Sequence, residues 1–151
     1  MFDRYVLLTA LIISCGPSNQ PPSDMKDMVA LARSGDYRSW ASEAAAHQSA
    51  GPHGTVRTFV NEPLLSSLRA GADTHPGGSV ALKELYDGAK VTGWAIDWKG
   101  SDGGWRFFEG FEPTVDQYFY AGTDNGCAGC HRPGKDFVLT PVSAFRDAGV
   151  P

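Results

Sequence analysis

Close to its C-terminal end the chain carries two cysteines and a histidine at a spacing that constrains the whole fold. Residues 127–131 have the sequence CAGCH, which is a C-x-x-C-H motif. At this spacing each thiol can add to one vinyl group of haem, and the adjacent imidazole can then ligate the iron. The motif therefore predicts one haem c, bound covalently through Cys127 and Cys130, with His131 as an iron ligand.

Two other uses of a C-x-x-C pair fit the sequence less well. Redox dithiols of the thioredoxin type lie near a βαβ unit, and no such pattern precedes this motif. A structural zinc site needs two further ligands at a second spacing, and no second Cys/His pair follows His131. A reducible dithiol beside an unused histidine is the alternative to haem attachment.

Length and composition limit the class of protein. The chain has 151 residues, which suits one domain with a single core and a buried cofactor. Its hydrophobic share of 42% and charged share of 20% are those of an ordinary folded protein. The net charge of -4 argues against nucleic acid as a partner, because a nucleic-acid surface needs a basic patch.

The N-terminal segment is similar to an export signal. Residues 5–13 (YVLLTALII) are too few to span a bilayer but have the length of a signal-peptide core. A small residue and Cys15 follow, as in the processing box of bacterial lipoproteins, where the cysteine is lipidated. We therefore expect a signal peptide over 1–14, a flexible Pro-rich tether over 15–23 and one domain over 24–151.

Haem of this kind is attached outside the cytoplasm in bacteria, so the export signal and the C-x-x-C-H motif agree. The expected location is the periplasm, or the outer membrane through a lipid anchor on Cys15. The alternatives are an exported protein whose Cys15 is incidental and a cytoplasmic protein. With Cys15 lipidated and the other two cysteines bound to haem, none of the three is left for a disulfide.

Local patterns predict an α+β fold, with a mainly antiparallel β-sheet, flanking helices and a C-terminal haem-binding segment. Helical spacing and end signals predict helices over residues 24–33, 37–48 and 62–70. Alternating apolar residues predict strands over residues 55–61, 79–86, 89–98 and 104–111. The last three strands are joined by short glycine-containing turns, so we expect them to pair as hairpins.

The second axial position of the haem iron has no obvious protein ligand. No methionine follows His131, and Met28 lies on the apolar face of a predicted helix, where methionine more often belongs to the core. The other histidines lie in helix ends or loops without ligand spacing: His47, His53 and His75. The sequence thus predicts an iron open on one side, suited to small-molecule binding or chemistry. Plain electron transfer, with Met28 or a histidine as sixth ligand, is an alternative.

Two charged residues stand out on predicted strands. Lys83 shares a strand face with Ala81 and Leu85, where a buried unpaired charge is costly, so it must reach solvent, pair or take part in chemistry. Desolvation would make its amine nucleophilic. Arg57 shares a face with Phe59 and is expected to donate hydrogen bonds to a ligand on iron. For both charges the alternative is an ordinary solvent-facing strand edge.

Several segments carry a family resemblance through their order and spacing. They are HGTVRTFVN at 53–61, PGGSVALKE at 76–84, GW at 104–105, the C-x-x-C-H motif, and DFVL at 136–139. In this order they resemble the cytochrome P-460 family, which includes the cytochromes c′-beta. The resemblance runs from about residue 37 to residue 145, which is most of the expected domain.

The resemblance implies a mainly antiparallel β-domain with helices, usually a homodimer, that holds one five-coordinate haem c. In cytochromes P-460 a lysine in the segment that matches Lys83 is cross-linked to the porphyrin, and the protein oxidises hydroxylamine. In the c′-beta relatives the matching lysine is not cross-linked, and an apolar pocket binds gases such as nitric oxide. Lys83 matches both groups, and Arg57 matches a distal arginine of the enzymes.

The enzymes also carry a distal carboxylate for proton transfer, in a longer segment after the lysine strand. Asp97 is the nearest candidate here, and a surface aspartate at a strand end is its alternative reading. The expected function is oxidation or binding of small nitrogen species, with Arg57, Phe59 and Lys83 bordering the open side of the haem and a redox partner cytochrome exchanging electrons. A nitric oxide carrier or sensor without catalysis is the alternative.

Overall fold

The computed structural model describes residues 25–115, 120–122 and 126–146. The predicted signal peptide, the tether and the lipidation site Cys15 lie outside these residues. Within the described part of the chain, no helix is long and apolar enough to cross a membrane.

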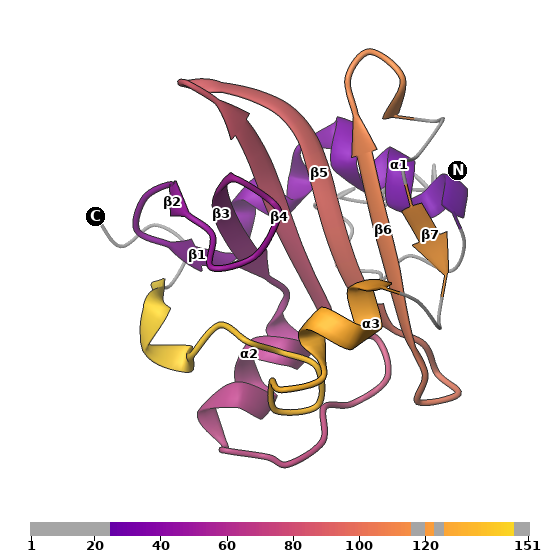
Figure 1. The fold of residues 1–151 in the computed structure, drawn as a ribbon. Coiled ribbons are helices and arrows are strands. Elements are labelled where there is room, and N and C mark those ends of the chain that lie inside the picture. The colour runs from indigo at the N-terminus through magenta and orange to yellow at the C-terminus, as the bar shows by residue number, and fades with distance from the viewer. Residues whose placement is uncertain (1–24, 116–119, 123–125, 147–151) are drawn as a thin grey trace, which may run out of the picture.

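An antiparallel sheet organises the described chain (Figure 1). Seven strands follow one another across it in the order β7-β6-β5-β4-β3-β1-β8, and β2 pairs separately with β3. Their bounds are β1 Ala41–Glu43, β2 His47–Gln48, β3 Thr55–Val60, β4 Val80–Asp87, β5 Lys90–Lys99, β6 Trp105–Phe111, β7 Tyr120–Gly122 and β8 Phe145–Arg146. This arrangement confirms the predicted α+β class with a mainly antiparallel sheet.

Three helices accompany the sheet: α1 Met25–Ser34, α2 Glu62–Arg69 and α3 Gly126–His131. The described residues also include the short 3₁₀ segments η1 Asp36–Ser39 and η3 Val142–Ala144. Helix α2 begins where predicted, because the side chain of Asn61 accepts a hydrogen bond from the Leu64 amide at 3.3 Å and Pro63 fits the first turn. In Figure 1, α3 lies in front of the sheet and α1 behind it.

Strand register assigns side chains to the two faces. On one face, Phe59 of β3 lies opposite Leu82 of β4, which lies opposite Ile96 of β5. This face packs against Met28 of α1 and holds the largest hydrophobic cluster, so we call it the α1 face. Because successive strand residues point to opposite sides, the residues between these belong to the other face.

The other face carries the C-terminal helix, and we call it the α3 face. Two cross-strand rows define it: Thr58, Lys83, Ala95 and Glu109 in one, Val60, Ala81, Asp97 and Phe107 in the other. Ala128 of α3 packs on Trp105 and Phe107 at the β6 end of this face.

One predicted element is wrong. Residues 37–48, predicted as a helix from their alanine content, form η1, β1 and β2 instead. Ala41 and Ser42 pair with Val60 and Phe59, on the edge of β3 that β4 leaves open. Filling this edge satisfies the backbone hydrogen-bonding groups of β3, and that tertiary pairing outweighs the local helix propensity of alanine.

Candidate functional site

The C-x-x-C-H motif forms a short helix held against the α3 face. Helix α3 ends at His131, two residues before Pro133, which cannot donate a helical hydrogen bond. Cys127 is half-buried beside Trp105 and Phe107, while Cys130 is exposed. Burial raises the pKa of the Cys127 thiol, and the nearby carboxylate of Asp97 acts in the same direction.

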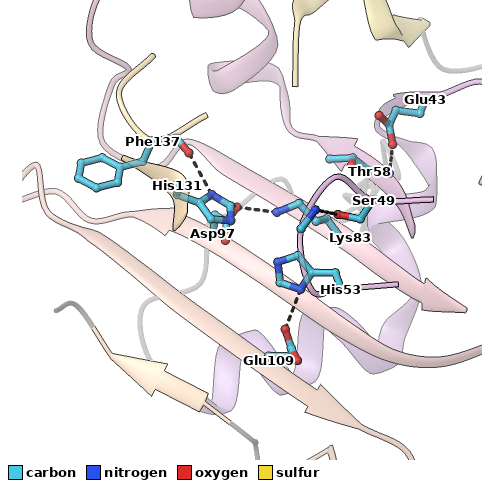
Figure 2. A network of polar contacts seen from close by, with 10 residues as sticks. Glu43, Ser49, His53, Thr58, Lys83, Asp97, Glu109, His131 and Phe137 are labelled. Carbon is cyan, nitrogen blue, oxygen red and sulfur yellow. Dashed lines mark hydrogen bonds and ion pairs between the residues drawn. The ribbon is translucent and has the colours of Figure 1, made fainter. Parts of the chain in front are cut away.

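His131 has one ring nitrogen engaged by the protein. Its Nδ1 lies 3.0 Å from the carbonyl oxygen of Phe137 (Figure 2), and a carbonyl can only accept, so Nδ1 carries the proton. The neutral ring then has its lone pair on Nε2, the form that ligates a metal. Burial lowers the pKa of His131, although the carboxylate of Asp97, 3.4 Å from Nδ1, opposes that shift.

A cavity of about 560 Å³ opens beside this histidine. Cys130 and His131 form part of its wall. The α3 face contributes an apolar group to the lining, Val56, Val60 and Ala81, and the C-terminal segment contributes Val138, Leu139 and Phe145. The cavity therefore combines one edge formed by the C-x-x-C-H motif with largely apolar walls.

Lys83 and Asp97 form an ion pair in the cavity wall. Lys83 Nζ donates to Asp97 Oδ2 at 3.0 Å, and the two side chains are only 12% and 10% exposed. Of the three uses predicted for Lys83, the structure therefore supports pairing. Asp97 is buried, which excludes the reading as a surface aspartate. Figure 2 shows its carboxylate between the lysine and the imidazole of His131.

Two further acidic–histidine pairs lie near the cavity, and the sequence did not indicate them. His53 Nδ1 lies 2.8 Å from Glu109 Oε2, and the His53 ring is 6.3 Å from that of His131 between centroids. Glu43 accepts a hydrogen bond from the Thr58 amide at 2.7 Å and also contacts His47. The His53–Glu109 pair depends on the tertiary fold, because 56 residues separate its members, whereas Glu43 and His47 are four residues apart.

Arg57 and Phe59 lie on the α1 face, away from the cavity. Arg57 donates to the Glu43 carbonyl and to the Ser42 hydroxyl, each at 2.9 Å, and its guanidinium lies 5.1 Å from the centre of the Phe59 ring. Phe59 packs in the main core. This placement is contrary to the expectation that both border the open side of a haem, because Thr58, and not its neighbours, shares a face with Lys83.

Of the other candidate axial ligands, two are buried away from the cavity and two line it. Met28 belongs to the core on the α1 face, and His75 is buried with its Nδ1 2.9 Å from the Ser67 hydroxyl. His47 and His53 line the cavity. Among the residues that the structure describes, no three His, Cys, Asp or Glu side chains are grouped to hold a metal ion by themselves.

Comparison with models of known protein families finds none that matches the chain, and comparison with curated proteins finds no significant match.

Proposed function

We propose that this chain is an exported monohaem c-type cytochrome of the P-460 type, with an iron site open on one side that oxidises or binds small nitrogen species. The observation that carries the proposal is the position of His131. The histidine of the C-x-x-C-H motif lies in a cavity wall, with its Nδ1 proton bonded to a backbone carbonyl. That hydrogen bond is the usual support of a metal-ligating histidine.

The residues present fit a haem. Cys127 and Cys130 lie on one short helix at the attachment spacing, and His131 follows directly. The cavity volume of about 560 Å³ falls within the roughly 300–1,000 Å³ of typical cofactor sites. Apolar walls suit the porphyrin ring, and the exposed Cys130 makes the motif accessible for attachment.

The cofactor would supply an iron that binds a small ligand and exchanges electrons with a redox partner cytochrome. In the oxidising reading, Asp97 would act on the histidine side of the haem, because its carboxylate lies 3.4 Å from Nδ1 of His131, the ring nitrogen that faces away from the iron. The Lys83 ammonium holds that carboxylate in place through its 3.0 Å hydrogen bond. Val56, Val60 and Ala81 supply apolar wall to the cavity. Arg57 is left without a role, because it lies on the α1 face.

The second candidate is a nitric oxide carrier or sensor without catalysis. The apolar share of the cavity wall favours it, since an uncharged diatomic gas needs no proton acceptor. Plain electron transfer through a Met28 ligand is disfavoured by the packing of Met28 in the core on the α1 face.

The first experiment tests haem attachment and coordination. The chain would be expressed with a bacterial haem-attachment system, and covalent haem would be measured by mass and by haem-stained denaturing gels. We expect one haem in the wild type and none in a Cys127→Ala, Cys130→Ala double variant, with a five-coordinate high-spin spectrum when reduced. A wild type without covalent haem, or with a six-coordinate low-spin spectrum in both oxidation states, would overturn the proposal.

The second experiment separates the enzyme from the gas-binding protein. A cross-link would add the Lys83 peptide to the haem peptide after digestion and shift the reduced Soret band far to the red. Lys83→Ala would then abolish both signatures. If its spectrum equals that of the wild type, the cross-link is absent, and nitric oxide affinity becomes the property to measure.

The location and assembly parts of the proposal are tested independently. Lipidation at Cys15 predicts that the wild type fractionates with membranes and that Cys15→Ser is soluble in the periplasm. A homodimer predicts twice the chain mass in light scattering of the soluble variant.

A further inference from the structure

Shortly after the C-x-x-C-H helix in the sequence, the carboxylate of Asp136 connects three parts of the fold by hydrogen bonds. Asp136 accepts hydrogen bonds from the backbone amide of His75 at 2.7 Å, from the indole of Trp105 at 3.1 Å, and from the ammonium of Lys99. These donors belong to the loop after α2, to β6 and to β5. The Asp136 side chain is only 12% exposed, and these donors outweigh burial and lower its pKa.

The chain around Asp136 adopts a turn that its residues do not favour. Asp136 and Phe137 have φ angles of 46° and 68°, and the Val138 amide donates to the Lys135 carbonyl at 3.0 Å. Two successive left-handed residues make a turn that normally contains Asn or Gly, and a bulky residue such as Phe137 raises its free energy. The surrounding structure must therefore hold the turn in place.

The turn ends at the proximal side of the proposed haem site. The carbonyl that accepts the Nδ1 proton of His131 belongs to Phe137, the residue directly after Asp136. Any rotation of this turn would move that carbonyl away from the imidazole. The three hydrogen bonds that anchor Asp136 therefore also restrain the carbonyl of the next residue, which accepts the hydrogen bond from His131.

We propose that Asp136 is a positioning residue for the iron ligand: by fixing the 135–138 turn to the sheet, it holds the Phe137 carbonyl against Nδ1 of His131. This inference rests on the proposed function, because it assumes that His131 ligates haem. A hydrogen-bond acceptor on Nδ1 fixes the orientation of the ring and increases its basicity as a ligand. Asp136 therefore acts on the haem through the Phe137 carbonyl and the His131 imidazole, without contacting the haem itself.

The test is resonance Raman spectroscopy of the iron–histidine stretch in the reduced, haem-loaded protein, together with the reduction potential. Asp136→Ala removes the three acceptor contacts. We expect the stretch to shift to lower frequency and broaden, and the potential to rise, because a less basic imidazole stabilises the oxidised iron less. Lys135→Ala is the matched control in the same turn. Its ammonium contacts the Gly71 carbonyl and Asp73, so its loss should leave both readouts at wild-type values.

Asp136→Gly separates anchoring from turn strain. Glycine adopts a positive φ without cost, so this variant keeps the turn favourable while it removes the carboxylate. We expect it to shift the stretch as Asp136→Ala does. A wild-type stretch in Asp136→Gly, or in Asp136→Ala with covalent haem retained, would overturn the inference while the proposed function stands. A wild type without covalent haem is the separate failure that removes both.

Discussion

Two buried carboxylates on opposite faces of the sheet, Glu84 and Asp97, are satisfied very differently. On the α1 face, Glu84 accepts from the Tyr37 hydroxyl at 2.7 Å, from the Arg38 guanidinium at 2.8 Å and from the Tyr86 hydroxyl. Trp94 in turn donates to Tyr37 at 2.9 Å. This network leaves the carboxylate enclosed in the core and fully engaged.

On the α3 face, Asp97 has fewer donors and borders the cavity. Lys83 is its hydrogen-bond donor, and the Nδ1 atom of His131 lies 3.4 Å away but is already bonded to a backbone carbonyl. Buried carboxylates with many donors are structural, whereas one with spare acceptor capacity beside a cavity can interact with a ligand. The difference favours a structural role for Glu84 and a role at the cavity for Asp97.

The largest effect should come from removing the α1-face carboxylate. Glu84→Ala leaves the buried hydroxyl of Tyr37 and the half-buried hydroxyl of Tyr86 without their acceptor and creates a void. We expect the free energy of unfolding to fall by about 3 kcal/mol, measured by urea denaturation of the haem-loaded protein. Glu112→Ala, which removes an exposed carboxylate, should change it little. An equal effect of both variants would contradict the structural role of the network.

Breaking the α3-face pair should cost less. Lys83→Met leaves Asp97 without its charged partner, and we expect a loss of about 2 kcal/mol in the free energy of unfolding. Adding Asp97→Asn removes the unpaired charge, so the double variant should recover part of this loss. If Lys83→Met destabilises the fold more than Glu84→Ala does, the α3-face pair is the main structural one, and the comparison fails.

Acid should weaken the α1 face through Glu84. Burial by itself disfavours ionisation, but the hydrogen bonds from Tyr86, Tyr37 and Arg38 outweigh it and lower the pKa of Glu84 from its ordinary 4.5. A lowered folded pKa contributes stability that is present above the unfolded value and lost as the pH falls through the folded value.

The stability of the wild type should therefore decline more steeply below pH 4.5 than that of Glu84→Gln. Urea midpoints measured from neutral pH down to acid would show the difference between the two slopes. Parallel slopes would mean that Glu84 is not preferentially ionised in the folded protein.

Some strands and contacts of the two faces could be predicted from the sequence, and others could not. Alternation and turn residues predicted β3 to β6 to within two residues at each end, because these signals are local. They did not predict β1 and β2, since those strands form only by pairing with the open edge of β3. Lys83 could be identified as a charge that needs a partner, but its contact with Asp97 depends on the pairing of β4 with β5.

The same limit explains Arg57. Alternation shows which residues of one strand share a face, yet it does not show which face meets the cavity, because that depends on register with β4. The register places Thr58 opposite Lys83, and so sends Arg57 to the α1 face opposite Glu84. The contact of His53 with Glu109 was not predicted for a related reason, because Glu109 lies on β6, 56 residues away.

The smallest effect is expected from Arg57→Ala, measured as nitric oxide affinity. This variant also tests directly whether ligand binding is confined to the α3 face. Its guanidinium contacts Glu43, Ser42 and Phe59, so its loss should leave the affinity of the reduced haem-loaded protein for nitric oxide within about twofold of wild type. Stopped-flow association and dissociation rates give that affinity. Thr58→Val, one residue along the strand but on the cavity wall, is the matched comparison and should alter the rates more. A tenfold loss in Arg57→Ala with unchanged Thr58→Val kinetics would mean that the arginine reaches the ligand and that function is not confined to the α3 face.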